Sequence, residues 1–222
     1  MAIILNIDCA QETASVGIAR EAECITTRRN ELQADHASWI HAAIQEMLAE
    51  TGINLAEAAA IAVTSGPGSY TGLRVGMATA KGLCYALQKP LICVPTLEMM
   101  AYAARNTTAT LICPMIDARR MEVYAAIYDK KLNELVSPEA LILEPTTYES
   151  YIAAHPVCFT GSGSKKLQGL VHSQHAVFED IPATVTDMSA LSYKRYMLQD
   201  FASLAYAEPL YIKEFYTAGR RK

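Results

Sequence analysis

Two apolar runs in the sequence, each typical of a buried strand, end in the same dipeptide, Ile-Asp. One apolar run ends at Ile7-Asp8 and another ends at Ile116-Asp117, 109 residues further along the chain. Each pair heads a strand–turn–strand pattern that is followed by helical periodicity. Continuous apolar runs of this length are typical of core strands, and self-similarity at a long interval indicates related structural units. We therefore predict an α/β fold of two related lobes, each a mixed sheet flanked by helices.

Hydrophobic spacing predicts the elements of both lobes. Strands are expected at 3–8, 14–20, 24–28, 60–64, 91–94, 111–117, 122–128, 134–143 and 157–160. Helices are expected at 38–50, 73–88, 96–105, 146–154 and 187–203. We place the first lobe at 1–105 and the second, smaller lobe at 106–186, with the segment 187–222 packing back on the first lobe. Within that segment, residues 209–212 are expected to be extended.

The balance of charge argues against an electrostatic clamp on nucleic acid. The chain has 19 Lys and Arg residues against 23 Asp and Glu, a net charge of −4, whereas such clamps present a basic patch. The basic residues concentrate only in the tail, and a short tail of this kind is interpreted as solvated. These tail residues are Lys213, Arg220, Arg221 and Lys222.

The N-terminus and the cysteines indicate a cytoplasmic protein. The first apolar run stops at Asp8, which makes it too short for a signal peptide or a membrane span. The six cysteines are scattered and include no Cys-x-x-Cys pair. This pattern is typical of reduced thiols rather than of a zinc site or a disulfide framework.

The most informative segment is a glycine-rich loop at residues 65–76, which reads Ser-Gly-Pro-Gly-Ser-Tyr-Thr-Gly-Leu-Arg-Val-Gly. A strand, such a loop and then a helix can present backbone amides to a phosphate. However, Gly68 and Gly72 are separated by three residues and followed by Leu73, so the Walker A spacing and its Lys-Ser/Thr are absent. The dinucleotide pattern fails as well, because Thr71 stands where its third glycine belongs. The loop is therefore a weak phosphate cradle.

A second pattern lies in the helix that follows this loop. Gly72, Gly76 and Ala80 recur every four residues and so form one stripe of minimal side chains. Glycine inside a helix costs up to about 1 kcal/mol relative to alanine, so we expect a close approach by another element to offset it. That element is either the chain's own helix at 38–50 or another subunit, and both contacts can hold on different faces.

Landmarks occur along essentially the whole chain: Ile7-Asp8, the loop at 65–76, Pro95-Thr96-Leu97, Ile116-Asp117-Ala118-Arg119, Glu122-Val123-Tyr124 and Glu208-Pro209-Leu210-Tyr211. Together they resemble the TsaB family, also called YeaZ. The resemblance implies an actin-like fold of two ribonuclease-H-like lobes. It implies a non-catalytic subunit that works with the larger paralogue TsaD, which transfers a threonylcarbamoyl group to tRNA, and with the ATPase TsaE. It further implies a homodimer in their absence, contact with tRNA only through the complex, and no membrane.

The resemblance also implies where partners bind. In this family the region 65–80 and the helix near 38–50 build the dimer surface, and homodimers and TsaD heterodimers use much the same surface. The residues expected to bind a partner are Trp39, Ile40, Ala43, Ile44, Met47, Tyr70, Thr71, Gly72, Arg74, Val75, Gly76, Thr79 and Ala80.

Nucleotide chemistry in the actin-like fold depends on an Asp and a nearby glycine in each lobe, because glycine lets the backbone approach a phosphate closely. Here Asp8 is followed by Cys9-Ala10, and Asp117 is followed by Ala118-Arg119. Both turns lack the glycine. We therefore predict no catalytic residue and no cofactor bound in the cleft, and we leave open weak or interface-bound ATP or ADP with magnesium.

The histidines do not have the spacing of a metal site. His36 and His41 are five residues apart, so on a helix they point about 140° away from each other. A same-face metal pair needs a spacing of four. His155, His172 and His175 are isolated and are interpreted as structural.

Other catalytic schemes are also weak. A Gly-x-Ser-x-Gly nucleophile elbow is absent from the sequence. Asp8 and Asp117 resemble half of a two-metal nuclease site, but that chemistry needs more converging carboxylates, and Glu12 and Glu122 are the only obvious additions. We expect a non-enzymatic subunit, with a stand-alone ATP-dependent or peptidase-like enzyme of the same fold as the alternative.

Overall fold

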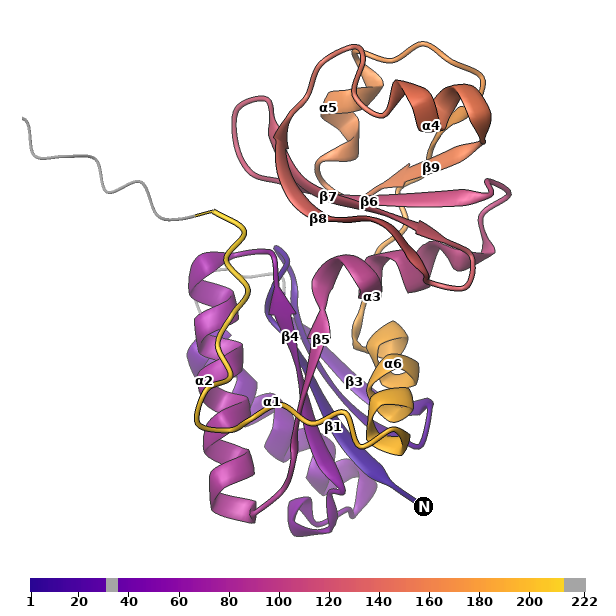
Figure 1. The fold of residues 1–222 in the computed structure, drawn as a ribbon. Helices are drawn as coiled ribbons and strands as arrows, with labels where there is room; N and C mark the ends of the chain where they lie inside the picture. Colours follow the sequence, from indigo (N-terminus) through magenta and orange to yellow (C-terminus); the bar gives the residue numbers. More distant parts are fainter. Residues whose placement is uncertain (31–35, 214–222) are drawn as a thin grey trace, which may run out of the picture.

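The computed structural model describes residues 1–30 and 36–213. These residues form two five-stranded sheets, one in each lobe, with helices packed against them (Figure 1). The prediction of an α/β fold with two related lobes is therefore confirmed. Within the described residues, none of the helices combines the length and the apolar character needed to cross a bilayer.

The two sheets have the same topology, which explains the sequence repeat. In each sheet the first strand is central, pairs antiparallel with the second, and pairs parallel with the fourth. The first sheet has the order β3-β2-β1-β4-β5 and the second has the order β10-β9-β6-β7-β8. Asp8 and Asp117 therefore lie at the ends of equivalent strands. The strands are β1 (Ile3–Asp8), β2 (Ala14–Arg20), β3 (Glu23–Asn30), β4 (Ala60–Gly66), β5 (Leu91–Pro95), β6 (Leu111–Asp117), β7 (Glu122–Asp129), β8 (Glu134–Ile142), β9 (Val157–Thr160) and β10 (Ala176–Phe178).

Helices cover both faces of the first sheet. One hydrophobic cluster joins α1 and α2 to one face, and another joins α3 and α6 to the opposite face (Figure 1). The α-helices are α1 (His36–Thr51), α2 (Tyr70–Leu87), α3 (Thr96–Ala103), α4 (Glu149–Ala154), α5 (Ser164–Gln168) and α6 (Val185–Met197), with 3-10 turns η2 (Leu55–Glu57) and η3 (Ala104–Asn106).

Helix α3 lies between the two lobes and joins their cores. Ile112 and Tyr128 of the second sheet belong to the same buried cluster as Leu97 of α3 and Ile92 of the first sheet. A largely buried ion pair adds to this junction, because Arg195 of α6 donates to both carboxylate oxygens of Glu98, at 3.3 and 2.6 Å. The lobes therefore share a continuous apolar contact behind the cleft that separates them.

Helix α6 begins two residues before the helix predicted at 187–203 and is shorter than that prediction. Thr184 forms a capping box with Asp187, which starts α6 at Val185. The helix ends at Met197, and Gln199 then adopts a left-handed conformation with a φ of 55°. Phe201 therefore lies outside the helix, although the predicted helix at 187–203 included it. Its ring packs on Tyr196, with the centroids 6.1 Å apart.

Two short elements have no counterpart among the predictions. These are α5, with five residues, and β10, with three. Periodicity needs more residues than either element contains. By contrast, α2 begins three residues before its predicted start, because the Ser69 hydroxyl oxygen accepts a hydrogen bond from Gly72 N and caps the helix.

The segment after α6 returns across the first lobe. Ala202 N donates to Leu91 O on β5 at 2.9 Å, and Lys81 Nζ on α2 donates to Ala207 O at 2.9 Å. Further on, Leu210 N donates to Ser65 O at 2.7 Å. Figure 1 shows this segment in yellow, running along α2 toward the second lobe. Of the predicted segment 187–222, residues 214–222 lie outside the described part.

Candidate functional site

A cleft of about 1640 Å³ separates the lobes, and the turns after β1 and β6 both line it. The ends of the equivalent strands β1 and β6 therefore meet at this cleft. Phosphate binding in this cleft would depend on the backbone and side chains of these two turns.

The carboxylate of Asp8 holds its own turn together. Asp8 is buried. Its Oδ1 accepts hydrogen bonds from Ala10 N and Thr64 Oγ1, both at 2.9 Å. Its Oδ2 accepts a hydrogen bond from Gln11 Nε2 at 3.2 Å. The side chain is therefore engaged in structural hydrogen bonds rather than directed at a ligand.

The backbone of this turn does not fit a phosphate. A phosphate site needs N–H groups that point at the anion, but Ala10 N is bound to Asp8 and Cys9 N donates to Thr64 Oγ1 at 3.4 Å. The turn instead presents carbonyl oxygens to the glycine-rich loop. A Cβ atom on Gly68 would lie 2.2 Å from Ala10 O, and one on Gly72 would lie 2.0 Å from Cys9 O. The loop therefore packs directly onto the turn.

Cys9 beside this turn has a buried thiol. Burial, reinforced by the negative charge of Asp8, raises the pKa of the Cys9 thiol far above its usual value. A thiol must ionise to attack a substrate or bind a metal. Cys9 therefore acts as a small apolar residue between β1 and α2.

The carboxylate of the second turn is held by a lysine. Asp117 Oδ1 accepts hydrogen bonds from Lys166 Nζ and from Arg119 N, each at 2.6 Å. Partial burial raises the pKa of Asp117, but the bonds from Lys166 and Arg119 outweigh it, so the pKa lies below its usual value. Asp117 is therefore ionised and paired at neutral pH.

The backbone of the second turn is also occupied. Ala118 N donates to Glu122 O at 3.1 Å, and Asp117 N donates to Ser162 Oγ at 3.0 Å. Arg119 and Arg120 adopt left-handed φ angles of 71° and 49°, a conformation that favours glycine. The N–H groups of Asp117 and Ala118, like those of Cys9 and Ala10, are thus engaged within the chain and are not offered to a phosphate.

The described residues also lack a metal-binding cluster. Across residues 1–30 and 36–213, no group of three or more His, Cys, Asp or Glu side chains is placed to hold a metal ion. His41 is exposed on α1, while the side chain of His36 lies outside the described part. His175 Nδ1 lies 3.0 Å from Ile152 O, a contact that holds the local fold.

The small-residue stripe on α2 faces the chain's own sheet. Gly72, Gly76 and Ala80 are buried. A Cβ atom on Gly76 would lie 3.4 Å from both Cys9 Cβ and Val63 Cγ2. The expected close approach of a second helix at these glycines is therefore wrong, because their nearest neighbours are the end of β1 and strand β4.

Some of the predicted partner-binding residues are buried, and the others have accessible surface. An i, i+3, i+4 apolar spacing marks a core face, and burial follows it. Partner contact remains a prediction for the members with accessible surface. Buried in the lobe's own core are Ile40, Ala43, Ile44, Met47, Gly72, Gly76 and Ala80, whereas Trp39, Tyr70, Thr71, Arg74, Val75 and Thr79 are exposed or half-buried.

A second small-residue stripe on α2 was missed. Ala78, Gly82 and Ala86 are exposed and also recur every four residues. A Cβ atom on Gly82 would meet nothing within 4 Å. Between this stripe and α1 lies a shallow hollow of about 370 Å³. We call this surface the α1–α2 face, and it comprises His41, Ala78, Thr79, Gly82, Leu83 and Ala86.

Known proteins match the chain along most of its length. The family model described as TsaD, tRNA N6-adenosine threonylcarbamoyltransferase, matches residues 29–208. The tRNA threonylcarbamoyladenosine biosynthesis protein TsaB of Escherichia coli is 30% identical over 219 residues, which span 95% of this chain and 94% of that protein. The Bacillus subtilis protein of the same name is 30% identical over 184 residues, spanning 82% of this chain and 77% of its own length.

A solved structure agrees with this result. YeaZ from Pseudomonas aeruginosa matches with a TM-score of 0.81 and 25% identity, covering 95% of this chain and 100% of that one. The resemblance noted in the sequence is thus confirmed by relatives and by fold. The chain belongs to the TsaB (YeaZ) family.

Proposed function

We propose that this chain is a non-catalytic subunit in the biosynthesis of tRNA threonylcarbamoyladenosine. It binds and activates the catalytic paralogue TsaD, together with the ATPase TsaE, and forms a homodimer in their absence. It contacts tRNA only through the complex. The names of the E. coli and B. subtilis relatives support the role in tRNA modification.

The observation that carries the proposal is the contrast between the cleft and the α1–α2 face. In the cleft, the N–H groups after Asp8 and Asp117 are engaged within the chain. On the outside, α2 presents a stripe without bulky side chains. Catalysis needs groups aimed at a reacting atom, whereas docking needs an accessible surface of suitable shape.

The shape of the α1–α2 face suits a partner helix. Helix axes pack about 8–10 Å apart, and small residues at the contact permit the shorter distances. Ala78, Gly82 and Ala86 form the floor, and His41 of α1 lies on one side. A helix from TsaD or from a second copy of this chain would lie in this hollow.

The test introduces a large side chain at Gly82, where the monomer has room for it. Gly82→Arg points into open space, so the monomer stays folded, while association with TsaD and with a second copy weakens about tenfold or more. Complex mass by light scattering and affinity by calorimetry measure this loss. Ala153→Arg, at an exposed position of α4, is the matched control and retains wild-type association. Unchanged association of Gly82→Arg would overturn the proposed docking face.

A further inference from the structure

Residues 209–213, at the end of the described part of the chain, bridge the two lobes. Leu210 N donates to Ser65 O at the end of β4 in the first lobe, at 2.7 Å. Three residues later, Lys213 Nζ lies 2.5 Å from Glu122 Oε1 at the start of β7 in the second lobe. Residues 210–213 all line the cleft. This segment therefore crosses the mouth of the cleft from one lobe to the other.

Contacts of Tyr211 with an arginine and a second tyrosine fix the middle of the segment. Arg74 Nε donates to Tyr211 Oη at 3.0 Å, and Arg74 Cζ lies 3.8 Å from the centroid of the Tyr70 ring. The two tyrosine rings have centroids 5.6 Å apart. A guanidinium group over an aromatic face is attracted to the π electrons, and its rigid plane loses little freedom on binding. Tyr211 is therefore anchored to the first turn of α2.

The glycine-rich loop is shaped to receive this segment. Gly66 adopts a φ of 109°, and a Cβ atom there would lie 2.8 Å from Leu210 O. Only glycine combines that conformation with so close a backbone contact. Gly66 thus serves the contact with Leu210, which gives this loop glycine a role apart from phosphate binding.

The position of these contacts suggests a mechanical role. The shared core around α3 joins the lobes on one side of the cleft. Within the cleft lining, Gln11 Nε2 donates to Ala183 O at 3.1 Å. At its mouth, residues 209–213 connect them again. We propose that residues 209–213 form a clasp that holds the lobes closed, so that hinge motion about the α3 junction requires its release. The inference is independent of the proposed function.

The clasp is built to open reversibly. Lys213 is about half exposed, at 53% of its side chain, and Glu122 is largely covered, at 18%. Solvent weakens an ion pair with one exposed partner. The segment also lies on the surface rather than in the core. Breaking these surface contacts therefore leaves the core of either lobe intact.

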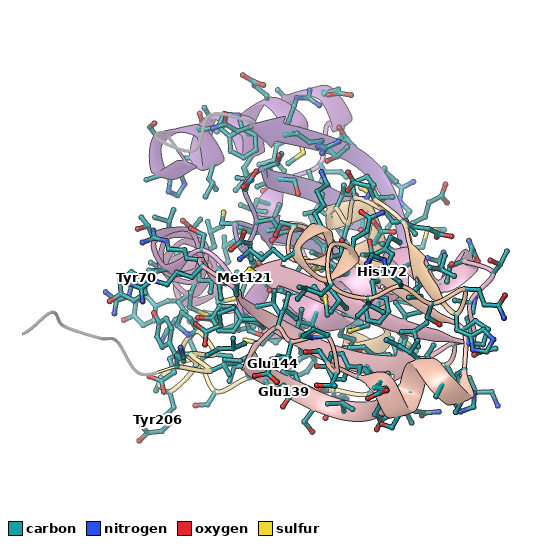
Figure 2. All side chains as sticks on the ribbon, turned by 90° about the horizontal axis from the view of Figure 1, so that it is seen from above. Tyr70, Met121, Glu139, Glu144, His172 and Tyr206 are labelled. Carbon is teal, nitrogen blue, oxygen red and sulfur yellow. The ribbon has the colours of Figure 1, made fainter. Side chains whose placement is uncertain are left out.

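The test separates the clasp from local packing. In Tyr211→Ala, hydrogen exchange of the Leu210 amide is expected to accelerate by roughly tenfold or more. In both Tyr211→Ala and Glu122→Gln, small-angle X-ray scattering is expected to report a larger radius of gyration. Tyr206→Ala and Glu144→Gln are the matched controls and leave both measurements unchanged. Tyr206 is 86% exposed and projects away from the protein, and Glu144 lies beyond β8 (Figure 2).

Three outcomes would contradict the clasp. Faster exchange at Leu210 with an unchanged radius of gyration would show that the segment packs locally on the first lobe and does not hold the lobes together. Unchanged exchange in Tyr211→Ala would remove even the anchoring contact. If Tyr211→Ala fails to fold, Tyr211→Phe keeps the ring and loses the bond from Arg74, so it is expected to show a smaller change in the same direction. No change in Tyr211→Phe and in Glu122→Gln would contradict the proposal equally.

Discussion

The carbonyl oxygen of Cys9 lies 2.0 Å from where a Cβ atom on Gly72 would stand. No other residue type fits at Gly72 without moving the backbone of the turn that follows β1. This contact joins the glycine-rich loop to the turn in which an actin-like kinase holds phosphate. It explains why the loop can have conspicuous glycines without being a phosphate cradle.

Gly72→Ala is expected to destabilise the protein, while Gly82→Ala stabilises it. The new methyl at Gly72 overlaps the Cys9 backbone, and overpacking of this kind costs about 1–3 kcal/mol. The methyl at Gly82 meets open space, so the gain in helix propensity of about 0.5–1 kcal/mol dominates. Urea unfolding measures both changes. A Gly72→Ala protein as stable as Gly82→Ala would contradict the packing described for α2.

Gly76→Arg is expected to disrupt folding rather than association alone. The side chain would have to enter between α2 and the sheet, where Cys9 and Val63 are already in contact distance. Circular dichroism and the yield of soluble protein report this outcome. Gly82→Arg, on the exposed stripe of the same helix, serves as the folded counterpart. A folded, normally stable Gly76→Arg protein would show that this face of α2 is more accessible than its burial indicates.

The pair formed by Asp117 and Lys166 predicts a pH-dependent contribution to stability. The pKa of Asp117 is lowered from its ordinary value of 3.8 in the folded state, so the pair stabilises the protein above pH 3.8. That contribution is lost as the pH falls through the lower, folded-state pKa. The Asp117 side chain is 43% exposed, so solvent limits the effect to less than about 1 kcal/mol.

Lys166→Met tests this pair. It is expected to lower the melting temperature at pH 7, and its difference from the wild type shrinks as the pH falls below 3.8. Lys165→Met is the control, because Lys165 lies 3.8 Å from Asp180 and both side chains are highly exposed. A Lys166→Met difference that persists undiminished in acid would assign the lysine to packing rather than to charge.

The isolated chain is expected not to bind ATP with magnesium at micromolar concentrations. The N–H groups of Cys9, Ala10 and Ala118 are already bonded within the chain, and a phosphate would have to displace those bonds. Calorimetry with ATP and magnesium measures the affinity, and phosphate release measures turnover. Micromolar binding with turnover would instead favour the stand-alone enzyme considered as the alternative.

The repeated Ile-Asp endings and the apolar runs were sufficient to predict two lobes of related structure. Strand β9 and the start of β6 match their predicted bounds because continuous apolar stretches bounded by turns leave few alternatives. Helix α5 and strand β10 were beyond prediction, since five and three residues do not complete a recognisable period.

The sequence by itself determined which residues share a face of each helix, because that depends only on the helical repeat. It did not determine what each face meets. On α2, the series Gly72, Gly76, Ala80 and the series Ala78, Gly82, Ala86 have the same spacing, yet the first is buried against the sheet and the second is exposed. Tertiary packing alone decided between them, because Gly72 and Gly76 lie against Cys9 and Val63 while Gly82 meets nothing within 4 Å. The bridge from Leu210 to Lys213 depends in the same way on contacts between residues far apart in the chain.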